Sequence, residues 1–268
     1  MNNEKIKPKL NGTAETMLQC FYARAMHSKN PKNKFHDAKA EELIDRLDYD
    51  FSNAKKDTAM SGGIVARSVV FDELVSEFIS KYPDCTVVNI ACGLDTRAYR
   101  MDNGRLTWYN LDLPETMAMR EKLLPESGAV TQIAMSAMDD WGSRIEETDA
   151  PVLIIIEGLT MYLTEADVQR IFAVIAGRFP QAAVLVETMN PMVVKRFKEK
   201  PIEGSNAKFT WGVRDGRALA ALLPDFRFVA EHGLTEGVAA FVPVYKLLDK
   251  LPAVRNISNR IVVLERKA

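Results

Sequence analysis

The stretch TVVNIACGLDTRAYR, residues 86–100, decides the fold. A mostly apolar run, TVVNI, is followed by two small residues and then by Gly93. Because a glycine has no Cβ, the backbone at Gly93 can come close to a bound ligand. In open α/β sheets, ligands bind beyond the carboxyl ends of the strands, where the strand order reverses. The stretch therefore predicts a parallel strand that leads into a ligand-binding turn.

Strand and helix patterns alternate on both sides of this turn. The β-rich runs are almost continuously apolar, which is typical of parallel strands covered on both faces. We therefore expect one α/β domain over residues 1–268, with a doubly wound and mostly parallel sheet. The predicted strands are 86–92, 106–113, 130–136, 151–158, 182–188, 226–234 and 259–267, and the predicted helices are 62–82, 115–124 and 164–179.

Two further segments flank the ligand edge in this prediction. Residues 1–62 have mostly helical patterns, and we expect them to form a helical cap over the sheet. Residues 190–215 mix turn-forming residues with apolar ones, which favours a lid or an insertion.

The composition narrows the range of partners. The chain has 35 basic and 36 acidic residues, so it lacks the basic footprint of nucleic-acid-binding proteins, and a small-molecule or protein partner is expected. Its apolar runs fall short of the roughly 18 residues of a membrane span. Three scattered cysteines favour a reducing cytoplasm, and the three histidines are too isolated to predict a metal site.

Asp112 suggests which ligand the turn binds. It lies nineteen residues after Gly93, at the end of a predicted strand, where an acid can accept hydrogen bonds from both ribose hydroxyls. Capping of the helix near Pro114 is the structural alternative for this acid. A dinucleotide also requires the G-x-G-x-x-G turn, but here Ala91 and Thr96 replace two of its glycines. S-adenosylmethionine has no phosphate, so the pattern favours it over a nicotinamide dinucleotide.

Three motifs carry a family resemblance, and the second of them extends through the helix that follows it. VVNIACGLDTRAYR (87–100), YNLDLPE (109–115), REKLLPE (120–126) and IIIEGLTMYLTEADV (154–168) follow one another along the chain. Together they resemble the leucine carboxyl methyltransferase family, in its bacterial branch of polyketide-type O-methyltransferases. The resemblance extends over about residues 10–215. It implies a class I S-adenosylmethionine-dependent methyltransferase, with a seven-stranded sheet whose last pair includes an antiparallel strand.

The resemblance also implies roles for individual residues. Arg67 matches the arginine that pairs with the methionyl carboxylate, and Ala91 and Gly93 match the turn that packs on the cofactor. Asp112 matches the ribose acid. Glu157 matches a glutamate close to the cofactor, and adenine is expected near Ser136 and Ala137. The family often has glycine at the position of Ala91. Eukaryotic members that modify proteins have an acid, a leucine and an arginine where this chain has residues 136–138, which disfavours a protein C-terminus as the substrate.

Several positions keep two interpretations at this stage. Asp95 either caps the helix that begins near Thr96 or contacts the cofactor's ammonium group. Glu157 follows five apolar residues, so a buried charge there needs a ligand or an arginine partner. Tyr162, Tyr22 and Trp211 either border the substrate pocket or pack in the core.

The chemistry of the reaction narrows the acceptor. Methyl transfer is an in-line displacement that depends on holding the two reactants close and aligned. A carboxylic acid with a pKa near 4 is already ionised at pH 7, whereas an ordinary phenol with a pKa near 10 benefits from a base. No histidine or lysine beside the motifs is convincing as a base, which favours an O-methyltransferase for a carboxylate or an acidic hydroxyl of a small, polyketide-like metabolite. A base supplied by the helical cap is the alternative. A nicotinamide-dependent oxidoreductase and a non-catalytic S-adenosylmethionine-binding protein are the alternatives.

Overall fold

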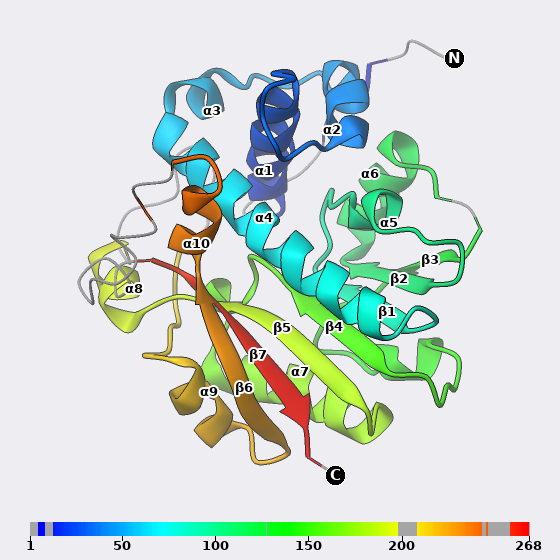
Figure 1. The fold of residues 1–268 in the computed structure, drawn as a ribbon. Helices are drawn as coiled ribbons and strands as arrows, with labels where there is room; N and C mark the ends of the chain where they lie inside the picture. The colour runs from blue at the N-terminus through cyan, green and yellow to red at the C-terminus, as the bar shows by residue number, and fades with distance from the viewer. Residues whose placement is uncertain are drawn as a thin grey trace.

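A seven-stranded sheet forms the centre of the molecule (Figure 1). The computed structural model describes residues 5–8, 13–126, 128–197, 208–242, 245 and 258–267. The strands are β1 Thr86–Ile90, β2 Thr107–Asp112, β3 Val130–Ala134, β4 Val152–Ile156, β5 Ala182–Thr188, β6 Phe226–Gly233 and β7 Arg260–Arg266. Each lies within a predicted strand, which confirms the expected fold class.

The strand order explains where a ligand can bind. The order is β3-β2-β1-β4-β5-β7-β6, and only β7 runs antiparallel to its neighbours β5 and β6. β1 pairs with both β2 and β4, so the chain builds the sheet outward in opposite directions from β1. The carboxyl ends of β1 and β4 therefore form the switch point at which doubly wound sheets bind their ligands.

Helices cover both faces of the sheet. Successive side chains of a strand point to opposite faces, and in β4 Ile154 faces one apolar cluster while Leu153 and Ile155 face the other. The helix α7, Glu165–Arg178, packs in the first cluster, and α4, Thr58–Lys81, packs in the second. Figure 1 shows α4 crossing in front of the sheet and α7 behind it.

Side-chain caps set the start of the long helices. Asp57 accepts a hydrogen bond from the Met60 backbone N–H at 2.8 Å, so α4 begins at Thr58, four residues before its predicted start. Thr164 and Asp167 form a capping box at the start of α7. The remaining elements beyond the cap are α5 Arg97–Arg100, α6 Pro114–Leu123, η2 Trp141–Arg144, η3 Thr160–Tyr162, α8 Pro191–Phe197, α9 Gly216–Leu222 and α10 Leu234–Ala239.

The N-terminal segment lies over the ligand edge of the sheet. It contains α1 Thr13–Ser28, α2 Ala38–Leu43, η1 Ile44–Arg46 and α3 Ser52–Lys56, which lie above the sheet in Figure 1. Leu18 and Phe21 of α1 pack in a common apolar cluster with Leu94 and with Leu123 of α6. The boundary of a cap at residue 62 stays a proposal.

A buried acid joins this segment to the turn after β1. Asp37 is fully buried and accepts hydrogen bonds from Arg24 at 2.8 Å and from the Thr96 hydroxyl at 2.6 Å. Arg24 also donates to the Leu94 carbonyl at 2.8 Å. Burial would raise the pKa of Asp37, but Arg24 and Arg100 outweigh it and hold the pKa below its ordinary value. The ionised acid therefore holds α1 and α2 against the turn.

Part of the expected lid at 190–215 lies outside the described residues, namely 198–207. In the described part, α8 follows β5, and the Thr210 backbone N–H donates to the Met161 carbonyl at 2.8 Å. A lid or insertion at 190–215 stays a proposal. Among the helices that the structure describes, none combines the length and the apolar content needed to cross a membrane.

Candidate active site

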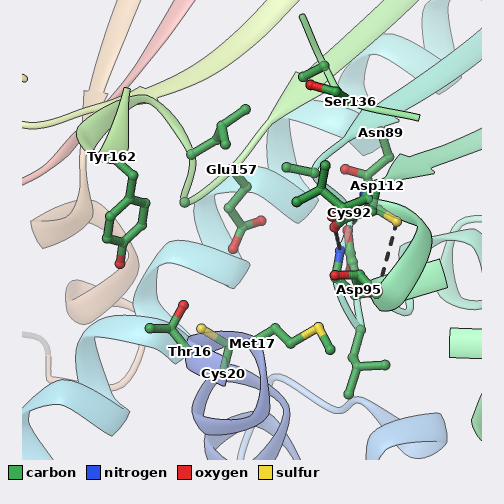
Figure 2. Close-up of a pocket in the computed structure, with 18 of the residues that line it drawn as sticks. Thr16, Met17, Cys20, Asn89, Cys92, Asp95, Asp112, Ser136, Glu157 and Tyr162 are labelled. Atoms are coloured by element: carbon green, nitrogen blue, oxygen red, sulfur yellow. Dashed lines mark hydrogen bonds between the residues drawn. The ribbon is translucent and has the colours of Figure 1, made fainter. Parts of the chain in front are cut away.

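A cavity of about 280 Å³ opens at the switch point of the sheet (Figure 2). Its lining comes from α1, from Arg67 on α4, and from the carboxyl ends of β1 and β2 and the segments that follow β1, β2, β3 and β4. The volume is close to the lower end of small-molecule sites, which span about 300–1,000 Å³. The structure thus brings the segments that follow four strands and two helices, α1 and α4, around one space.

The turn at Gly93 faces Asp112. Gly93 has a left-handed φ of +49°, and its N–H donates to Asp112 Oδ2 at 2.8 Å. The Leu113 N–H donates to Asp112 Oδ1 at 2.7 Å. Burial raises the pKa of Asp112, while these two hydrogen bonds oppose the rise. Ala91 is also left-handed, with a φ of +54°, a conformation that glycine adopts at lower cost.

Two arginines hold Glu157. It follows β4, and its oxygens lie 2.7 Å from Arg67 Nε and 2.6 Å from Arg97 Nη1. Burial would raise the pKa of Glu157, but Arg97 and Arg67 outweigh it and lower the pKa. The expectation that this buried charge has a partner is confirmed, and the partners are arginines.

Arg67 also contacts a second acid. Its Nη1 lies 3.1 Å from Glu187 of β5, and its Nη2 donates to Cys20 Sγ at 3.4 Å. Burial would lower the pKa of Arg67, but Glu187 and Glu157 raise it well above the ordinary value, so the guanidinium stays charged. A guanidinium has five N–H donors, and these contacts with described residues do not use all of them.

Asp95 makes its contacts at the start of α5, and its contact with the cofactor's ammonium group stays a proposal. Its Oδ1 accepts a hydrogen bond at 3.0 Å from the backbone N–H of Arg97, the first residue of α5. Its Oδ2 accepts from Asn89 at 2.8 Å and pairs with the Arg97 side chain at 2.7 Å. Asp95 also lines the cavity. Burial would raise its pKa, but Arg97 and Arg100 outweigh it, so the pKa is lowered.

Tyr162, Thr16 and Cys20 lie at the end of the cavity away from Asp112 (Figure 2). The ring of Tyr162 packs against Phe209 with centroids 5.5 Å apart. Burial raises the pKa of Tyr162, so its hydroxyl stays protonated at neutral pH. Ser136 and the neighbouring Ala137, in the turn after β3, line the cavity on the side of Asp112.

Two predicted pocket residues lie elsewhere. Tyr22 stacks on Phe51, with centroids 4.7 Å apart, and Trp211 packs against the apolar cluster of one sheet face. Neither is among the residues that line the cavity. Both aromatic side chains instead have core packing partners, which the sequence pattern left open as the alternative.

Met17, Cys20 and Asn89 line the cavity, but they were not predicted as site residues from the sequence. A helical stripe could have identified Cys20, because Thr16, Cys20 and Arg24 recur every four residues along α1 and all line the cavity. Asn89 could not be identified by pattern, because it lies within an apolar strand.

The cysteine of the turn has a packing role. Cys92 is buried with its Sγ 3.9 Å from Met117 Sδ, and burial raises the pKa of its thiol. Within the described residues, no group of three or more histidine, cysteine or acidic side chains is arranged to hold a metal ion.

A family model described as leucine carboxyl methyltransferase matches residues 17–176. The chain belongs to the leucine carboxyl methyltransferase family. The matched range contains the Gly93 turn, Asp112 and Glu157, so it covers most of the cavity.

Two relatives of this methyltransferase match most of its length. The tetracenomycin polyketide synthesis O-methyltransferase TcmP of Streptomyces glaucescens is 34% identical over 85% of this chain and 85% of its own. The S-adenosyl-L-methionine-dependent methyltransferase dpfgK of Gibberella zeae is 28% identical, with 84% and 83% covered.

A solved structure shares the fold at low identity. The crystal structure of a DUF574 family protein from Streptomyces avermitilis superimposes with a TM-score of 0.62 at 10% identity, over 94% of this chain and 97% of the other. Taken with the family match, the fold is that of a class I methyltransferase, and the enzyme depends on S-adenosylmethionine. This decides between the two nucleoside cofactors that Asp112 allowed.

Proposed function

We propose that this methyltransferase transfers the methyl group of S-adenosylmethionine to a carboxylate or an acidic hydroxyl of a small, polyketide-like metabolite. The observation that carries the proposal is a single cavity with the Gly93 turn and Asp112 at one end and the uncharged Tyr162 and Thr16 at the other. The relative TcmP, an O-methyltransferase of tetracenomycin polyketide synthesis, supports the acceptor class. A cytoplasmic location, favoured by the three free cysteines, belongs to the same proposal.

The residues around the cavity suit each part of the cofactor. Asp112 would accept hydrogen bonds from the ribose hydroxyls, and Ser136 and Ala137 would lie beside the adenine. Unused donors of Arg67 would bind the methionyl carboxylate, while Asp95 and Glu157 would attract the ammonium group. Ala91 and Gly93 would pack on the cofactor. When bound, the cofactor supplies a methyl group activated by its positive sulfur.

Removal of the Asp112 carboxylate tests this placement. We expect Asp112→Ala to weaken binding of S-adenosylhomocysteine at least tenfold, because loss of a hydrogen bond to a charged group costs about 1.5–3 kcal/mol. Isothermal titration calorimetry measures the change. Asp84→Ala, which removes an exposed acid of a surface ion pair, is the matched control and leaves the affinity unchanged. Equal affinities for the two variants would contradict the ribose assignment.

The acceptor class follows from the groups at the Tyr162 end. In the described part of the chain, the titratable groups that line the cavity are arginines, acids, cysteines and Tyr162. Tyr162 keeps its proton, so it donates a hydrogen bond rather than removing a proton from the acceptor. An acceptor that is already ionised in solution therefore suits this site best.

Transfer of a radiolabelled methyl group tests the acceptor. A panel of aromatic acids, acidic phenols, aromatic amines and carbon nucleophiles is incubated with the enzyme and methyl-labelled cofactor, and each product is then treated with alkali. Methyl esters release labelled methanol, whereas aryl methyl ethers keep their label. Transfer to nitrogen or carbon acceptors alone would contradict the proposal. Tight cofactor binding without transfer to any acceptor would favour the non-catalytic alternative.

A further inference from the structure

A buried arginine lies beneath the Gly93 turn, outside the cavity lining. Arg120 of α6 is fully buried, and its Nη1 donates to the Gly93 carbonyl at 2.9 Å. We infer that Arg120, held by Glu126, is a positioning residue that fixes the Gly93 turn in the conformation that binds the cofactor. The inference rests on the cofactor placement proposed above.

The two peptide groups of Gly93 are each held by a side chain. Its N–H donates to Asp112 at the end of β2, and its carbonyl accepts from Arg120. A glycine populates left-handed and right-handed conformations with similar ease, so its own sequence does not select the φ of +49°. Hydrogen bonds at both peptide groups make this selection, and α6 supplies one of them.

Glu126 fixes the arginine in turn. Arg120 Nε donates to Glu126 Oε1 at 2.9 Å, and Arg120 Nη2 contacts the same oxygen. The Glu126 side chain is 2% exposed and accepts further hydrogen bonds from Asn110 at 2.9 Å. Asn110 lies two residues before Asp112, on the same face of β2. The strand that carries the ribose acid thus also anchors the ion pair that holds the turn.

The charge of Arg120 acts on the same acid. Burial raises the pKa of Asp112, and Arg120 is among the groups that oppose this rise. Arg120 stays charged, because although burial lowers its pKa, Cys92 and Glu126 raise it above the ordinary value. Arg120 therefore orders the turn and also favours the ionised form of Asp112. Since it is not part of the cavity lining, it acts through Gly93 and Asp112 rather than through direct ligand contact.

Arg120→Gln, Arg120→Lys and Arg105→Gln test the inference. Arg105 belongs to an exposed ion pair with Asp84, so its variant is the matched control. Calorimetric titrations with S-adenosylhomocysteine and with adenosine are run from pH 5 to pH 9. We expect Arg120→Gln to weaken the binding of both ligands by the same factor, at least tenfold, because the turn would contact the adenosine part that the two ligands share. Because Arg120→Gln also removes a positive charge near Asp112, its affinity should begin to fall at a higher pH than that of the natural chain. Arg120→Lys restores the charge and therefore the original pH profile.

Arg120→Gln can also unfold the protein, since it leaves Glu126 buried without a cation. The double variant Arg120→Met with Glu126→Gln avoids this problem and keeps an acceptor for Asn110. Circular dichroism confirms that each titrated variant is folded. A folded double variant with affinity within twofold of the natural chain, and with an unmoved pH profile, would overturn the inference. If Asp112→Ala is weakened while the Arg120 variants are not, only this inference fails. If Asp112→Ala also binds normally, the cofactor placement fails as well.

Discussion

At the residue scale, Ala91 has a backbone conformation that disfavours a side chain. Its φ of +54° costs an L-residue about 1–2 kcal/mol, whereas glycine adopts it freely. Glycine also increases the freedom of the unfolded chain, which costs about 0.4–1 kcal/mol. We therefore expect Ala91→Gly to leave the free energy of unfolding unchanged or to raise it by up to about 1 kcal/mol, as measured by urea denaturation.

Two controls frame this result. Ala220→Gly, inside α9, should lower the free energy of unfolding by about 0.5–1 kcal/mol, because Ala220 has an ordinary helical backbone. Ala91→Val should lower the free energy of unfolding, in contrast to Ala91→Gly, since a branched side chain is disfavoured at positive φ. Equal losses for Ala91→Gly and Ala220→Gly would show that the turn does not strain Ala91.

At the element scale, α10 crosses α4 through a glycine contact. A Cβ placed on Gly237 would lie 2.0 Å from the carbonyl oxygen of Ala66, the residue before Arg67. We expect Gly237→Ala to force the helices apart and to lower the free energy of unfolding by about 1–3 kcal/mol. It should also weaken binding of S-adenosylhomocysteine, because Arg67 moves with α4. Thermal unfolding and calorimetry measure the two effects.

Gly177 in α7 is the matched control for Gly237. A Cβ there meets no atom within 4 Å, so Gly177→Ala should raise stability by up to about 1 kcal/mol through helix propensity alone. Equal effects of the two alanine substitutions would show that the α10–α4 contact has room for a methyl group.

At the scale of the whole molecule, ligand binding and folding should respond differently to acid. Asp37, Asp95 and Glu157 have lowered pKa values, set by burial and by the arginines that outweigh it. Their contribution to stability is present above the ordinary carboxyl pKa of about 4 and is lost as the pH falls below it. At Asp112 the hydrogen bonds and Arg120 do not outweigh burial, so its pKa is raised and its ionised form is lost at a higher pH.

The affinity for S-adenosylhomocysteine should therefore fall on acidification before the protein unfolds. Calorimetry and circular dichroism from pH 7 to pH 3 compare the two transitions. In Asp112→Asn, which is neutral at every pH, affinity should be lower throughout and should lose this separate acid transition. Coincident loss of binding and of folded structure in the natural chain would contradict the prediction.

The sequence by itself determined the sheet and the core of the ligand turn. Alternation of apolar runs and helical stripes located all seven strands, because periodicity and capping act within a few residues. The spacing from Gly93 to Asp112 likewise placed two residues that the structure joins by a hydrogen bond of 2.8 Å. The motif resemblance was also sufficient for the family, which the family model confirms.

Only the tertiary structure decided which distant side chains meet. Arg67 reaches Glu187, 120 residues away, because β4 and β5 are neighbours and α4 lies across them. The sequence pattern also could not predict three other features. These are the positions of Tyr22 and Trp211 outside the cavity, the contact between α10 and α4, and the hydrogen bond from Arg120 to Gly93. Periodicity predicts which face of an element is buried, but the partner across that face depends on strand order and helix packing, which arise from the whole chain.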